Sequence, residues 1–183
     1  TMSQEAIEAH VNTLRTLSAT ELKPLADSGD QFAQYYLGNK YAQGKEVAQN
    51  MQLARQMWEL AGNQGNANAL YNLGTMAYTG QGAQRNYAQA LELFKRSANA
   101  GNPRAAFNVA SMLERGQGAN INLQEAAQFY KLAGDTSPKA LYRLGLLYAR
   151  GGDNLPVDLN QAMTYLQQAA AKGEPTAMHA VQL

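Results

Sequence analysis

The sequence of 183 residues contains no cysteine, so it can form no disulfide, use no thiolate nucleophile and offer no cysteine ligand to zinc. It also lacks any apolar run approaching the roughly 18 residues that a membrane-spanning helix needs. The formal net charge of +1 gives no general reason to expect binding to nucleic acid or to an anionic membrane. What remains is a chain long enough to bury a core, with 45% hydrophobic residues.

A targeting segment is not predicted either. The first ten residues, TMSQEAIEAH, lack the basic region and the apolar stretch of a signal peptide. Because a threonine precedes the methionine, removal of a leader stays possible, and the compartment stays open between the periplasm or exterior and the cytoplasm. Charge is uneven along the chain: residues 1–32 hold five acidic and two basic side chains, whereas residues 101–150 hold three acidic and six basic ones.

What the sequence does contain is a fourfold internal repeat with a period of 35 or 36 residues. It is visible in an aliphatic position (Leu37, Leu73, Val109, Leu144), a small residue after it (Gly38, Gly74, Ala110, Gly145), a closing glycine (Gly44, Gly80, Gly116, Gly151) and an alanine (Ala54, Ala90, Ala126, Ala162). Glycine within a helix costs about 1 kcal/mol relative to alanine. That loss is recovered if two helix axes approach closely at this position, which is the role we expect for it.

Each repeat is predicted to form two antiparallel helices. The first helices are expected to begin at Asp30, Asn66, Asn102, Ser137 and Glu174, and the second helices at Asn50, Asn86, Asn122 and Asp158. Gln89, Glu125 and Gln161 lie three residues after three of these caps, which predicts capping boxes. Gly65, Gly101 and Gly173 are expected to end second helices as left-handed caps.

Two short helices cannot bury both faces alone, so neighbouring repeats must stack. The predicted organisation is one continuous solenoid domain. It comprises N-terminal capping helices at 1–29, repeats at 30–65, 66–101, 102–136 and 137–173, and a partial fifth repeat or C-terminal helix at 174–183.

The segments AQYYLGNKYAQG, ALYNLGTMAYTG, AAFNVASMLERG and ALYRLGLLYARG resemble the Sel1-like repeat family, a relative of the tetratricopeptide repeat. The resemblance covers about residues 30–183. It implies an all-α fold, a right-handed α/α solenoid superhelix of stacked antiparallel helix pairs. For function it implies a non-enzymatic adaptor or scaffold that binds a protein or peptide on its concave face, in a bacterial envelope, secretion or signalling complex.

Two alternatives remain open from the sequence. One is an immunity-type protein that neutralises a secreted toxin by direct binding. The other is an enzyme of cell-wall or β-lactam chemistry, which would need an S-x-x-K motif; the nearest string is Thr136-Ser-Pro-Lys139, and no K-T-G motif accompanies it. His10 and His179 lie far apart without an H-E-x-x-H motif, so neither a metal site nor a catalytic site is predicted. No cofactor is predicted, because the two GQG strings lack the strand and third glycine of a nucleotide-binding loop.

By analogy with tetratricopeptide repeats, exposed positions of the first helices line the concave surface. The predicted partner-binding residues are Tyr35, Asn39, Tyr71, Thr75, Tyr78, Phe107, Ser111, Arg115, Tyr142 and Arg150. The aromatic residue near the middle of each first helix also fits packing against the neighbouring repeat, and that role is favoured over an interface role.

The two arginines among these residues, Arg115 and Arg150, each end a first helix, where positive charge complements the helix dipole. The fold alone does not require arginine there. Together with Arg104, Lys139 and Arg143 they therefore also predict a basic rim for acidic side chains or a C-terminal carboxylate of a partner. The oligomeric state stays open.

Overall fold

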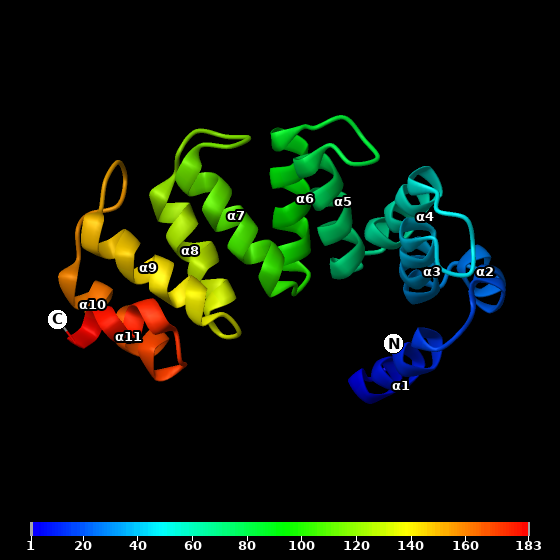
Figure 1. Ribbon diagram of the computed structural model, residues 1–183, viewed down its shortest axis with the longest axis horizontal. Coiled ribbons are helices and arrows are strands. Elements are labelled where there is room, and N and C mark those ends of the chain that lie inside the picture. The colour runs from blue at the N-terminus through cyan, green and yellow to red at the C-terminus, as the bar shows by residue number, and fades with distance from the viewer. Residues whose placement is uncertain (1, 183) are drawn as a thin grey trace. The chain divides into compact units, whose positions relative to one another are not determined.

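The computed structural model describes residues 2–182, and within this range every regular element is an α-helix (Figure 1). The first helices along the chain are α1 (Gln4–Arg15), α2 (Ala19–Asp27), α3 (Gln31–Gln43), α4 (Met51–Asn63) and α5 (Ala67–Thr79). They are followed by α6 (Tyr87–Asn99), α7 (Pro103–Arg115), α8 (Leu123–Gly134), α9 (Pro138–Arg150), α10 (Leu159–Ala171) and α11 (Pro175–Gln182). The all-α prediction is confirmed.

The helices form two compact units, one reaching to Arg85 and the other beginning at Asn86. In the first unit, α2 packs on α3, α3 on α4 and α4 on α5, while α1 lies against α3. In the second unit, each helix from α6 to α11 packs on the next one along the chain. Each unit therefore buries its apolar surface between sequence neighbours, as a repeat architecture requires.

The helix starts follow the predicted caps. Side-chain oxygens of Asp30, Asn66, Asn102 and Ser137 accept backbone N–H groups at the starts of α3, α5, α7 and α9, and those of Asn50, Asn86, Asn122 and Asp158 do the same for α4, α6, α8 and α10. The predicted left-handed glycines Gly65, Gly101 and Gly173 have φ values of 89°, 109° and 91°. Local sequence chemistry thus sets these boundaries.

At the starts of α8 and α10, one of the two hydrogen bonds of the predicted capping box is absent: the side chain at the third helical position does not accept the N–H of the cap residue. The backbone N–H of Asn122 donates to the carbonyl of Leu113 on the preceding helix at 3.0 Å, and that of Asp158 donates to Tyr148 at 2.9 Å. Because this N–H is already used, the side chain of Gln161 bonds the Asp158 carboxylate instead. This backbone bond ties the second helix to the first, and the loop from Tyr148 to Asp158 keeps it although that loop is one residue longer.

The small residues on the first helices permit the close approach that the sequence predicts. A Cβ atom at Gly38 would lie 2.5 Å from Nε1 of Trp58, and one at Gly145 would lie 2.8 Å from Cγ of Leu166. The large residues opposite, Trp58 and Leu166, are only 5% and 9% exposed. Burial of such side chains contributes roughly 1.5–3 kcal/mol each to stability.

Candidate binding surface

In the first unit, α3, α4 and α5 surround a hollow of about 410 Å³, which we call the amide hollow. Its lining includes three of the predicted residues, Tyr35, Asn39 and Thr75. The complete lining is Tyr35, Asn39, Ala42, Gln43, Met51, Trp58, Asn72, Thr75, Met76, Thr79 and Gln81, with no charged side chain among them. The hollow therefore offers hydrogen bonds and apolar contact rather than ion pairs.

Asn39 is the hydrogen-bonding centre of the amide hollow. Its Oδ1 accepts from Nε1 of Trp58 at 3.2 Å and from Nδ2 of Asn72 at 3.4 Å. The indole N–H is also within 3.3 Å of the Tyr35 carbonyl oxygen. These bonds leave Nδ2 of Asn39 as a donor and Oδ1 of Asn72 as an acceptor, which is the pair of functions that one peptide group can satisfy. Neither Trp58 nor Asn72 is among the partner-binding residues that the sequence predicts.

In the second unit, the ends of α7 and α9 and the loop after α9 surround a hollow of about 400 Å³, which we call the arginine hollow. Both predicted arginines line it. Its lining is Glu114, Arg115, Ile121, Leu123, Arg143, Arg150, Gly151, Gly152 and Asp153. Three guanidinium groups face two carboxylates, so the hollow carries an excess of positive charge.

Glu114 joins the rim of the arginine hollow to the core. Its Oε1 accepts from the hydroxyl of Tyr130 at 2.7 Å, and its Oε2 accepts from a guanidinium nitrogen of Arg150 at 3.0 Å. The Arg150 side chain remains 68% exposed. Within residues 2–182, Arg115 and Arg143 form no ion pair with a carboxylate. Glu114 and Arg150 lie 36 residues apart, which is one repeat length. This spacing of opposite charges is the sequence signal that could have indicated the pair.

Burial raises the pKa of the Tyr130 phenol well above its ordinary value, and the hydrogen bond to the Glu114 carboxylate raises it further. The phenol therefore stays protonated in the folded chain at pH values where an exposed tyrosine ionises. This arrangement keeps the hydroxyl as a donor to Glu114 over the whole neutral range.

We expect this raised pKa to appear as an alkaline loss of stability that depends on Tyr130. In the unfolded chain the phenol ionises near pH 10, so above that pH the folded state binds more protons and stability falls as pH rises. The contribution is complete below pH 10 and is lost as pH approaches the raised folded-state pKa. Relative to Tyr130→Phe, the wild type should lose about 1 kcal/mol between pH 8 and pH 11, measured by urea unfolding. An equal difference at both pH values would contradict the assignment.

The aromatic residues of α7 and α9 are engaged in packing. The ring of Phe107 meets Tyr130 edge to face at 5.6 Å, and the ammonium group of Lys139 lies 5.5 Å from its centroid. Tyr142 packs against the cluster that includes Leu141. Both rings are half-buried. Their packing is consistent with the favoured structural role.

Five of the ten predicted residues lie in the first unit and five in the second. Tyr35, Asn39 and Thr75 line the amide hollow and Arg115 and Arg150 line the arginine hollow, whereas Tyr71, Tyr78, Phe107, Ser111 and Tyr142 are half-buried and line neither. Thr75 also donates its hydroxyl to the Tyr71 carbonyl at 3.1 Å. The side chains available for contact are therefore mainly amides in one unit and arginines in the other.

The string considered for β-lactam chemistry has other roles. Ser137 caps α9 by accepting the N–H of Ala140 at 3.1 Å, and Lys139 lies over Phe107. Across residues 2–182, no group of three or more histidine, aspartate or glutamate side chains is arranged to hold a metal ion. The helices in that range are also too short or too polar to cross a bilayer.

Comparison with known proteins gives the same repeat. The family model described as Sel1 repeat matches residues 31–66, 67–102, 103–135 and 138–174. No curated protein matches the chain in sequence.

Solved structures share the fold. A Sel1 repeat protein from Oxalobacter formigenes is 30% identical with a TM-score of 0.77, over 90% of this chain and 47% of the other. The protective antigen c5321 of uropathogenic Escherichia coli is 29% identical with a TM-score of 0.79, over 88% of this chain and 35% of that one. The chain thus spans less than half the length of either. The immunity protein Pa5087 from Pseudomonas aeruginosa, 17% identical with a TM-score of 0.54 over 97% of this chain and 69% of its own, is similar in fold alone.

Proposed function

The chain belongs to the Sel1 repeat family, and on that premise we propose that it is a non-enzymatic adaptor that binds a protein or peptide along the first helices of its repeats. Repeats of this family generally mediate protein–protein interactions. Support comes from the lining of the two hollows. Each includes side chains of two first helices, and these side chains supply hydrogen bonds, apolar contact and positive charge.

The arginine hollow carries the more specific part of the proposal, which is an acidic partner. Among the residues that the structure describes, no carboxylate pairs with Arg115 or Arg143, and Arg150 is exposed although it contacts Glu114. A guanidinium group can bind a carboxylate through two parallel hydrogen bonds. A positive charge that only complements a helix dipole does not need this paired geometry. We therefore propose that the hollow accepts an aspartate, a glutamate or a C-terminal carboxylate of the partner.

The test uses a displayed library of random peptides with free or amidated C-termini. Peptides that bind the wild type should be enriched in carboxylates, and Arg115→Glu with Arg150→Glu should weaken the best of them by about 30-fold or more, or roughly 2 kcal/mol. Lys23→Glu with Lys45→Glu, at exposed positions of the first unit, is the control with the same charge change. An unchanged affinity in the arginine variant, or an equal loss in the control, would remove the proposed carboxylate site.

A further inference from the structure

Helix α1 lies outside the repeats and is attached to α3 along one narrow stripe. Within α1 only Leu14 is buried, while Ile7, His10 and Val11 are half-buried. These four residues have the i, i+3, i+4, i+7 spacing of a single helical face. The rest of α1 is exposed. Its packing is therefore that of a short amphipathic helix laid on a surface, with one side chain entering the core.

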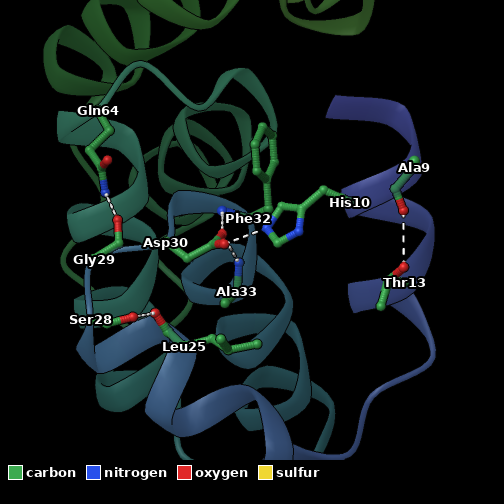
Figure 2. A network of polar contacts seen from close by, with 10 residues as sticks. All are labelled: Ala9, His10, Thr13, Leu25, Ser28, Gly29, Asp30, Phe32, Ala33 and Gln64. Carbon is green, nitrogen blue, oxygen red and sulfur yellow. Dashed lines mark hydrogen bonds and ion pairs between the residues drawn. The ribbon is translucent and has the colours of Figure 1, made fainter. Parts of the chain in front are cut away.

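The main polar contact joins His10 of α1 to the cap of α3, as Figure 2 shows. Nε2 of His10 bonds Oδ2 of Asp30, while Oδ1 of Asp30 accepts the N–H groups of Phe32 and Ala33 at 2.9 and 3.0 Å. The imidazole also meets the ring of Phe32 edge to face at 6.2 Å. One oxygen of the Asp30 carboxylate therefore caps α3, and the other bonds the docked helix α1.

A second contact lies nearly two turns further along α3, six residues after Asp30. Arg15, at the end of α1, is beside Tyr36, and the tyrosine hydroxyl raises the pKa of the guanidinium group. The aromatic body of Tyr36 packs on the same core cluster that Leu14 joins. Helix α1 therefore covers α3 from Asp30 to Tyr36 and places a nitrogen donor near each end of that stretch.

The covered stretch continues into the amide hollow. Phe32 and Asn39 are seven residues apart, which places them on the same face of α3 about two turns apart. Asn39 and Tyr35 line the hollow, whereas Phe32 lies under α1. One face of α3 is thus covered by a helix in its N-terminal half and open in its C-terminal half.

From this arrangement we infer that the N-terminal half of this face is a helix-binding surface, that α1 occupies it as an internal ligand, and that a partner helix of the same chemistry displaces α1. Such a partner is amphipathic, with an apolar i, i+3, i+4, i+7 stripe and a histidine or arginine for Asp30. The inference rests on the proposed function only in treating the first helices as the binding surface. A helix held by one buried side chain and two polar contacts belongs to the easily opened part of a fold.

The first measurement is hydrogen exchange of the full chain carrying His10→Ala with Arg15→Ala. Amides of α1 should lose at least tenfold in protection, while those of α3 and α4 keep theirs. The control is Glu5→Ala with Asn12→Ala, which changes two exposed positions of the same helix and should leave α1 protected. Equal protection of α1 in both variants would overturn the assigned contacts.

The second measurement uses a labelled synthetic peptide with the sequence of residues 2–16. It should bind the His10→Ala, Arg15→Ala chain at least tenfold more tightly than the wild type or the control, because an attached α1 competes at high effective concentration. A peptide carrying His10→Ala should bind the same variant more weakly. Equal binding to all three chains, or no binding to the released variant, would overturn the helix-binding surface. None of these results depends on the arginine hollow, so they separate this inference from the proposed carboxylate site.

Discussion

Replacing Tyr130 by alanine is expected to lower the free energy of unfolding of the second unit by about 3–5 kcal/mol. Tyr130 is completely buried and is the largest such side chain among the described residues. Its ring packs against Phe107, and its hydroxyl donates to Glu114. Alanine would leave a cavity between α7 and α8 and remove the hydrogen bond that joins Tyr130 to Glu114. Hydrogen exchange of the α7 and α8 amides measures the loss in this unit directly.

The conservative change Tyr130→Phe separates the ring from the hydroxyl. It keeps the packing and removes one hydrogen bond to a carboxylate, so at neutral pH it should cost about 1–2 kcal/mol. If alanine and phenylalanine cost the same, the ring is not the source of stability. If phenylalanine costs nothing, the bond to Glu114 contributes nothing at neutral pH.

The second large effect is expected at Gly38, where alanine should destabilise the first unit by about 1–3 kcal/mol. The new Cβ would overlap the indole of Trp58, whose N–H is held by Asn39. This loss opposes a gain of about 1 kcal/mol in helix propensity, which would dominate if the site were open. Urea unfolding followed by the fluorescence of Trp58, the only tryptophan in the chain, reports on this unit.

A double-mutant cycle with Trp58→Phe tests the cause. The third repeat already places a six-membered ring, Tyr130, at the position equivalent to Trp58, with Ala110 in the place of the glycine. Phenylalanine is the suitable substitute, because Ala42 stands where Glu114 would be needed to bond a tyrosine hydroxyl. Gly38→Ala should therefore cost at least about 1 kcal/mol less when Trp58 is phenylalanine, measured by circular dichroism. Strictly additive costs would show that the indole is not what the Cβ meets.

The sequence predicts the repeat elements well because their signals are local and occur four times. Asn50 and Asn122 cap their helices with their own side chains, so the residue type and its place in the period are sufficient. The capping box at Asn122 fails for a non-local reason, since its N–H bonds Leu113 on the neighbouring helix. The residue pattern of one helix indicates which of its own side chains can cap it, but it does not indicate that a carbonyl on another helix accepts the same N–H.

The candidate sites are less predictable for the same reason. Helix α1 has no equivalent in the other repeats, so no period indicates that His10 lies at Asp30. Likewise, repeat alignment places Arg150 at a helix end but does not reveal that Glu114 bonds it. The binding roles of the ten predicted residues, the immunity-type alternative and the repeat boundaries stay predictions.

The backbone bonds from the caps Asn122 and Asp158 to the preceding helices have a consequence for loop length. One bond joins Leu113 to Asn122 and so holds together the two ends of the loop between α7 and α8. The other joins Tyr148 to Asp158 and does the same for the loop between α9 and α10. The longer loop takes up its additional residue in a tight bend closed by mutual bonds between Gly152 and Leu155, at 2.9 and 2.7 Å. Loop length is thereby uncoupled from helix pairing, so a loop of this kind can lengthen by one residue while the two helices that it joins keep their backbone bond.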